Sequence, residues 1–169
     1  MVSRMTPATA KAQRDLNLIY NPYVGHEGGG QVFKAIPSNP KSSVSSLEGW
    51  THNGPGDHEV LKALRVRWDD GEEKTYGHPS GHSKATTIHK SERIRRMNVG
   101  AGDWVDSIQY ESTHAPSGWK VGGDDGPPHE QDVGNGVLMG FWGRAGSDID
   151  ELGAVFQSDE DQVESEESS

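Results

Sequence analysis

The 169-residue sequence contains no cysteine. This absence excludes disulfide bonds, thiolate metal sites and cysteine nucleophiles, and it is typical of proteins from a reducing, cytoplasmic setting. The sequence also lacks any apolar run long enough to cross a membrane, and its first residues lack the apolar segment of a secretory signal. We therefore expect a cytoplasmic protein that does not insert into a membrane.

Basic residues are scarce relative to acidic ones, and the net charge is −10. Six of the 26 acidic side chains lie in residues 158–169, which contain no basic residue. The rest of the chain therefore has 20 acidic and 16 basic side chains. We expect an N-terminal arm at 1–20, one folded domain at 21–157 and an acidic, disordered tail at 158–169. This charge balance does not favour nucleic acid as a partner.

No long helical period is present, and short apolar stretches alternate with turns that contain many of the 22 glycines. The alternation over 60–68, followed by Asp69-Asp70-Gly71, predicts a β-hairpin. The segment 37–56 is rich in serine, proline and asparagine, which predicts a long loop. Further strands are expected at 31–36, 73–76, 86–89, 93–99, 105–111, 119–121, 137–142 and 149–157. The pattern indicates an all-β sandwich, barrel or prism.

An internal repeat narrows this choice. The pattern Ala-Gly-x-x-[Val/Ile]-Asp-x-[Ile/Leu] occurs at 101–108 and again at 145–152. A third segment aligns with these two through Leu64, but it carries Lys62 where the others carry Asp106 and Asp150. The repeat predicts three similar β units around a pseudo-threefold axis, with the first strand packed beside the last.

Four segments of the chain resemble the jacalin-related lectins: 28–33, 105–111, 122–126 and 140–153. The resemblance covers roughly 23–156 and implies a type I β-prism of three four-stranded Greek-key sheets. It also implies a non-enzymatic protein that binds sugar without a metal or other cofactor. The site would lie between a Gly-rich loop near the N-terminus and a Gly-x-x-x-Asp loop before the last strand.

Carried over to this sequence, the resemblance assigns four residues to that site. Gly30 would offer its backbone, Ser147 and Asp148 their main-chain N–H groups, and Asp150 its carboxylate. A carboxylate can accept hydrogen bonds from two sugar hydroxyls, and adjacent N–H groups in a tight turn can bind sugar oxygens.

The sequence departs from the family pattern in the first loop. His26 and Glu27 replace the first pair of glycines that members often have. Family members that favour galactose have a cut chain that frees a glycine amine, whereas Gly30 follows 29 residues of uncut sequence. The resemblance therefore implies glycans that contain mannose or glucose as partners.

The second copy of the repeat leaves two interpretations open. Asp106 could accept hydrogen bonds, the Asp103 and Trp104 amides could donate them, and Gly122-Gly123 could supply the opposing loop of a second sugar site. Trp104 could also stack on a sugar face. Alternatively, this loop is only a turn of the repeated fold.

Other site types are less well supported. His78 and His82 are four residues apart, but Pro79 and Gly81 are incompatible with a helix that would present both to a metal. The absence of cysteine removes a further ligand type, so we expect no metal site.

Paired carboxylates of a glycosidase are a further alternative, drawn from Asp103, Asp106, Asp148 and Asp150. Asp148 and Asp150 share one tight turn, however, and no second carboxylate is placed across a cleft. The main rival to a lectin is a structural or protein-interaction β-domain with silent sugar loops. Weak single sites would favour several sites per particle, and hence a homodimer.

Overall fold

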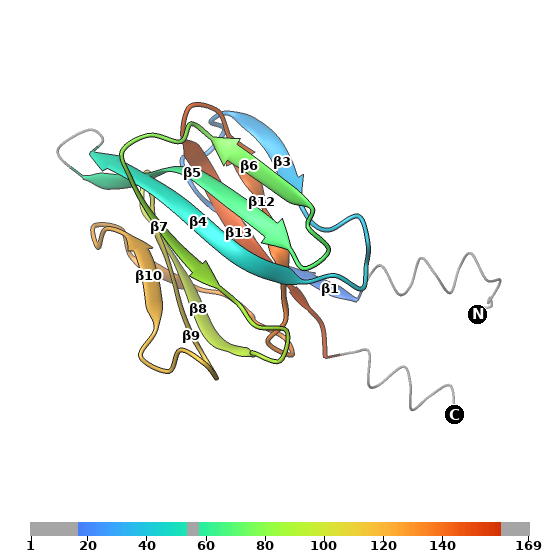
Figure 1. Cartoon of the computed structure of the whole chain (residues 1–169). Helices are drawn as coiled ribbons and strands as arrows, with labels where there is room; N and C mark the ends of the chain where they lie inside the picture. Colours follow the sequence, from blue (N-terminus) through green and yellow to red (C-terminus); the bar gives the residue numbers. More distant parts are fainter. Residues whose placement is uncertain (1–16, 54–57, 160–169) are drawn as a thin grey trace, which may run out of the picture.

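Strands account for the regular structure of the residues that the structure describes. The structure, a computed structural model, describes residues 17–53 and 58–159. These residues form thirteen strands and no helix, arranged in three antiparallel sheets (Figure 1). The predicted all-β fold of three sheets is confirmed.

The first sheet joins the two ends of the domain. Its strand order is β1-β13-β12-β3, and β2 also pairs with β13. The bounds are β1 Leu18–Tyr20, β2 Val24–Gly25, β3 Gln31–Ala35, β12 Leu138–Ala145 and β13 Ile149–Gln157. The pairing of β1 with β13 confirms that the first strand lies beside the last.

The other two sheets have four strands each and share one order. The second sheet is β6-β5-β4-β7, with β6 Glu73–Gly77, β5 Glu59–Trp68, β4 Val44–Asn53 and β7 His82–Thr87. The third sheet is β10-β9-β8-β11, with β10 Trp119–Gly122, β9 Val105–Ser112, β8 Ile94–Ala101 and β11 Pro128–Glu130. In both, a central hairpin is flanked by the two strands that follow it in the chain.

The three central hairpins also share their irregularities. Each of the pairs β12–β13, β8–β9 and β4–β5 contains two register shifts, one near the beginning of its first strand and one near the end. β-Bulges bend a strand and redirect the side chains that follow. Their recurrence at corresponding positions gives the three turns similar local paths and supports the pseudo-threefold repeat.

One core lies between the sheets. The aligned residues Leu64, Ile108 and Leu152 are each 0% exposed, one from each central hairpin. Trp68 is also buried, and its indole N–H donates a hydrogen bond of 2.8 Å to the Met139 carbonyl. The repeat in the sequence therefore corresponds to a repeat in the core, in which every unit contributes an equivalent aliphatic side chain.

A glycine in each unit allows the outer strand to approach the central one. These glycines adopt left-handed backbone angles: Gly25 has φ 137°, Gly77 has φ 84° and Gly122 has φ 106°. A Cβ atom on any of them would overlap a main-chain carbonyl oxygen of the neighbouring strand. Only glycine tolerates both the angle and the contact.

The residue after each glycine then donates its N–H to the carbonyl that the glycine approaches. The bonds are His26 to Asp150 at 2.7 Å, His78 to Lys62 at 3.0 Å and Gly123 to Asp106 at 3.1 Å. Asp150, Lys62 and Asp106 therefore occupy equivalent places, as the sequence alignment predicted.

The predicted loop at 37–56 is wrong over half of its length, because Val44–Asn53 forms β4. Its buried positions include the small residues Gly49 and Thr51, and a register shift between Val44 and Ser46 interrupts the alternation. The strand therefore lacks the regular apolar period by which 60–68 was recognised. The short strand β11 was missed for a similar reason, since its pattern begins with Pro128.

The predicted boundary between arm and domain is also too late in the chain. Residues Leu18–Tyr20 belong to β1 and pair with β13, Leu18 opposite Gln157. Three residues are too few to show a strand period, so this strand has no signal in the sequence. Residues 1–16 of the predicted arm and 160–169 of the predicted tail lie outside the described residues.

The close approach of the outer strands predicts a measurable difference between two glycines of one hairpin. Gly71 has φ 94° with no atom within 4 Å of a built Cβ, whereas a Cβ on Gly77 would overlap the Lys62 carbonyl. We expect Gly71→Ala to lower the free energy of unfolding by about 1–2 kcal/mol, the cost of the left-handed angle. Gly77→Ala should lower it by about 3 kcal/mol or more, because the strands must also separate. Urea denaturation measures both; equal losses would contradict this account.

Candidate functional site

The Gly-rich loop between β2 and β3 meets the turn between β12 and β13. Gly30 has φ 62°, and a Cβ on it would overlap Asp150 Oδ2 and lie 2.6 Å from the Ala145 carbonyl carbon. A Cβ on Gly29 would lie 3.0 Å from Asp150 Cγ. The backbone of the loop is therefore in direct contact with the Asp150 carboxylate.

The turn itself is closed by a hydrogen bond of 2.9 Å from the Gly146 N–H to the Asp148 carbonyl. This turn leaves Ser147 exposed at its tip and Asp148 and Asp150 half-buried on either side of the buried Ile149. The four predicted residues of the first site are thus brought together by one loop and one turn.

Arg144 holds the Gly-rich loop in place. Its Nε donates to the Gly29 carbonyl at 2.8 Å and its Nη2 to the Gly30 carbonyl at 3.1 Å. The Glu151 carboxylate lies 3.9 Å from the same guanidinium. Sequence reasoning missed Arg144, because the repeat has Gly100 at the corresponding position and so contains no periodic signal.

The electrostatic environment of Asp150 disfavours its charged form. Burial raises the pKa of the Asp150 carboxyl, and the negative charge of Asp148 adds to the rise. His26 and Arg144 act in the opposite direction and lower that pKa. The carboxylate is thus only partly solvated and is available to hydroxyl donors.

The third unit contributes a cation to this site. Lys62 Nζ forms an ion pair with Asp148 Oδ1, and both side chains are half-buried. Lys62 stands where the other two units carry an aspartate, so the third unit lacks the acceptor of a similar site. Its side chain instead orients Asp148 from the neighbouring unit.

The second copy of the repeat builds a closely similar arrangement. The Gly102 N–H donates to the Trp104 carbonyl at 3.1 Å, which repeats the bond that closes the first turn. A Cβ on Gly126 would overlap Asp106 Oδ2 and lie 2.8 Å from the Ala101 carbonyl carbon. Gly126 therefore has the same relation to Asp106 as Gly30 has to Asp150.

This finding corrects the predicted membership of the second set. Gly122 and Gly123 were expected to oppose Asp106, but they correspond to Gly25 and His26 and contact the Asp106 main chain. Gly126 takes the place beside the carboxylate. Gly126 could have been recognised from the sequence, since it is the last residue of the segment 122–126. The Gly-rich loops of the two units differ in length, however, so the alignment did not match Gly126 with Gly30.

Asp106 is more deeply buried than Asp150. It is 3% exposed, and its Oδ1 accepts no hydrogen bond within the described part of the chain. Burial raises the pKa of its carboxyl, and Asp125 adds to the rise. His58 and the Gly126 N–H lower that pKa.

The two sets of loops adjoin each other. The imidazole of His26, from the Gly-rich loop, stacks on the indole of Trp104, from the turn between β8 and β9, with centroids 5.4 Å apart and planes 10° from parallel. A Cβ on Gly25 would lie 2.8 Å from Val105 Cγ2. The first Gly-rich loop is therefore packed against the second turn.

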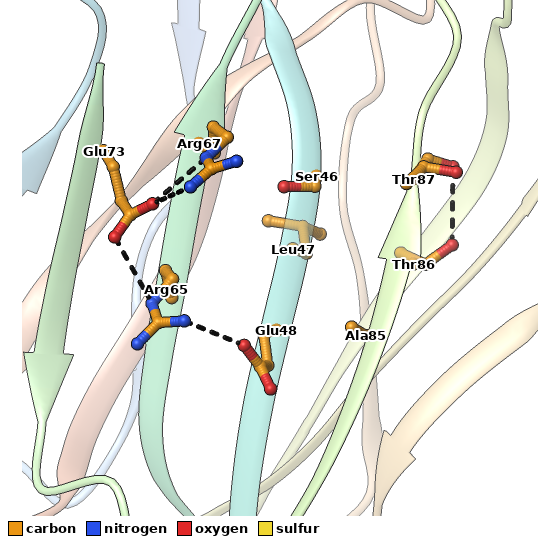
Figure 2. Close-up of a pocket in the computed structure, with 9 residues that line it drawn as sticks. All are labelled: Ser46, Leu47, Glu48, Arg65, Arg67, Glu73, Ala85, Thr86 and Thr87. Carbon is orange, nitrogen blue, oxygen red and sulfur yellow. Dashed lines mark hydrogen bonds and ion pairs between the residues drawn. The ribbon is translucent and has the colours of Figure 1, made fainter. Parts of the chain in front are cut away.

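Outside these loops, an open hollow lies on the outer face of the β6-β5-β4-β7 sheet (Figure 2). Figure 2 shows a ladder of ion pairs across it, with Glu73 2.6 Å from Arg67 and Glu48 3.1 Å from Arg65. Both guanidinium groups already have carboxylate partners, and the hollow shares no residue with the two loop sets. The loops are therefore the better candidate site.

Two further findings concern groups that could hold other ligands. The described residues contain no group of three or more His, Cys, Asp or Glu side chains that could hold a metal ion. None of the described structure is a helix long and apolar enough to cross a membrane.

The fold defines a β-prism, in which two units have similar sets of loops. The family model of the jacalin-like lectin domain matches residues 24–155, so the chain belongs to this family. A search of the curated proteins finds no match.

Solved structures show the same fold. A lamprey immune protein superimposes with a TM-score of 0.74 at 20% identity, covering 84% of this chain and 45% of its own. This chain therefore spans less than half of the lamprey protein. AcmJRL, a mannose-binding jacalin-related lectin from Ananas comosus, has a TM-score of 0.64 at 19% identity, covering 82% and 96%. The wild-type Malaysian banana lectin has a TM-score of 0.61 at 20% identity, covering 80% and 96%.

The burial of Asp106 predicts that its charge destabilises the fold. Because its pKa is raised in the folded state, ionisation costs more in the folded chain than in the unfolded chain. We expect Asp106→Asn to raise the free energy of unfolding at pH 7, on the order of 1 kcal/mol. The gain should shrink as the pH falls through the raised pKa, and vanish below the ordinary aspartate value of 3.8.

Chemical denaturation between pH 3 and pH 7 measures this difference. Asp103→Asn is the matched control, because Asp103 is exposed on the same turn and should change stability little. A loss of stability in Asp106→Asn at pH 7 would show that the charged carboxylate is instead stabilised in the fold.

Proposed function

We propose that this protein is a non-enzymatic lectin that binds glycans containing mannose or glucose, without a metal. The observation that carries the proposal is the contact of the Asp150 carboxylate with the backbone at Gly30, beside the turn at Ser147 and Asp148. Membership of the family supports a lectin, and the similar jacalin-related lectin from Ananas comosus binds mannose.

The chemistry of a hexose matches this arrangement. Each hydroxyl both donates and accepts hydrogen bonds, and the Asp150 carboxylate can accept two of them in short, charge-assisted bonds. The main-chain N–H groups of Ser147 and Asp148 would donate to the same pair of hydroxyl oxygens. Gly30 is exposed, and because it has no Cβ its backbone lies against the Asp150 carboxylate, so a sugar bound to Asp150 would also meet the opposing loop.

The corresponding groups around Asp106 support a second site of the same kind. Gly126 replaces Gly30, and the amides of Asp103 and Trp104 replace those of Ser147 and Asp148. The Asp106 Oδ1 is buried and accepts no hydrogen bond from the described residues, so a sugar hydroxyl that entered beside Gly126 would supply its missing donor. The carboxyl of Asp106 is less exposed than that of Asp150, so we expect the second site to bind more weakly.

Shallow polar sites of this type bind single sugars weakly, with a Kd on the order of 0.1–1 mM. Useful affinity then comes from several sites on one particle, which favours a homodimer. With no cysteine in the sequence, we place this activity in the cytoplasm. The alternative is a protein-interaction domain of the same fold whose sugar loops are silent.

Two conservative substitutions test the sites separately. Asp150→Asn and Asp106→Asn keep the side-chain shape but remove the charged acceptor, and each lost charge-assisted bond is worth about 1.5–3 kcal/mol. We expect Asp150→Asn to weaken binding of methyl α-mannoside at the first site by at least about tenfold. Asp106→Asn should lower the number of binding sites per chain from two to one. Isothermal titration calorimetry measures both quantities.

Asp70→Asn is the matched control, since Asp70 lies in the turn between β5 and β6 and belongs to neither site. It should bind methyl α-mannoside as the wild type does. If the wild type binds glycans and only free galactose competes with them, the protein is a lectin but the proposed preference for mannose or glucose is wrong. No binding of any glycan on an array would favour the silent domain.

A further inference from the structure

The contact between the two loop sets is made by aromatic side chains. His26 and Trp104 stack nearly parallel at 5.4 Å, His26 being exposed and Trp104 half-buried. The other two junctions, the places where neighbouring units meet, lack this stack in the residues that the structure describes. The residues that correspond to His26 are Gly123 in one unit and His78 in the other. The second Gly-rich loop meets its neighbouring unit through the ion pair of His58 with Asp125, at 2.9 Å.

Each ring of the stack belongs to the immediate surroundings of one carboxylate. The His26 N–H binds the Asp150 carbonyl at 2.7 Å, and a Cβ on Gly29 would lie 2.9 Å from His26 Cδ2 and 3.0 Å from Asp150 Cγ. Trp104 precedes Asp106 by two residues, a separation of roughly 7 Å along an extended chain. The stack therefore joins the loop that contacts Asp150 to the turn that carries Asp106.

The junction at His26 and Trp104 is distinguished by an aspartate on both sides. At the other junctions of the prism, one flanking unit carries Lys62 in place of the acceptor. Two pyranose units that approach from either side of the stack would thus each meet a carboxylate. Their C–H faces could pack on the rings, because aromatic side chains combine an apolar face with a polar edge.

We propose that the two loop sets form one ligand surface, on which a mannose-type oligosaccharide reaches Asp150 and Asp106 together across the His26–Trp104 stack. This inference rests on the proposed function and names its ligand class: a glycan with at least two neighbouring pyranoses. The second contact is then intramolecular, so an oligosaccharide gains affinity over a monosaccharide without a second protein chain. His26 and Trp104 are the specificity-determining residues of this surface.

Calorimetry on the full chain tests the joined surface with two probes, methyl α-mannoside and the branched trimannoside with α1→3 and α1→6 arms. For the wild type, we expect one trimannoside but two monosaccharides per chain. The trimannoside should bind about tenfold more tightly or better. Trp104→Ala and His26→Ala should each lower the affinity for the trimannoside by a factor at least about fivefold larger than the factor by which they lower the affinity for the monosaccharide.

Two further variants separate stacking from loss of structure. Trp104→Phe keeps a ring at the junction and should retain most of the trimannoside advantage. Trp50→Ala removes a half-buried tryptophan that lies under Arg65, 5.0 Å away, on another sheet, and should leave the ratio of the two affinities unchanged. Thermal unfolding shows that each variant is folded under the conditions of the titration.

The outcomes distinguish this inference from the proposed function. Equal affinities for the two probes, or two trimannosides per chain, would overturn the joined surface and leave the lectin intact. The same holds if Trp104→Ala weakens both probes equally. If the wild type binds neither probe, both proposals are wrong.

Discussion

The architecture of the loops depends on one backbone contact that is repeated at the equivalent position of each sheet. A glycine with a left-handed φ lies against a carbonyl of the central strand, and the next residue donates its N–H to the same oxygen. A side chain at any of these glycines would force the strands apart. Because the contact is made by main-chain atoms, it sets the path of the loop whatever side chains follow. The residue whose carbonyl accepts this bond therefore has the same position in every unit; these residues are Asp150, Lys62 and Asp106.

The three equivalent positions carry two aspartates and one lysine, and this difference separates the units chemically. Asp150 and Asp106 are held in surroundings that raise the pKa of their carboxyls, mainly through burial. Burial makes each of these carboxyls harder to ionise in the folded chain than in water. Lys62 breaks the series and pairs with Asp148 of the neighbouring unit. One prism thus carries an aspartate at the equivalent position of two units and, in the third, a lysine that pairs with an aspartate of a neighbouring unit.

Much of the fold and of the candidate site could be predicted from the sequence alone, because the residues that form the repeat lie close together in sequence. The motif at 101–108 and 145–152 combines a turn glycine, a buried aliphatic and an aspartate within eight residues. It therefore predicted two similar turns and the matched core position of Leu64. Strand β4 was missed because two of its four buried residues, Gly49 and Thr51, are not apolar strand formers and its period is interrupted. Strand β1 was missed because three residues show no period.

The sequence by itself thus determined the all-β class, the three units and which turns carry an aspartate. Only the tertiary structure decided how the units complete one another. It placed Gly126 against Asp106, Arg144 on the Gly-rich loop, and His26 on Trp104. The physical reason is that local spacing governs turns and strand periods, whereas these contacts join residues that are from 20 to more than 100 positions apart. Their meeting depends on how the sheets pack around the shared core.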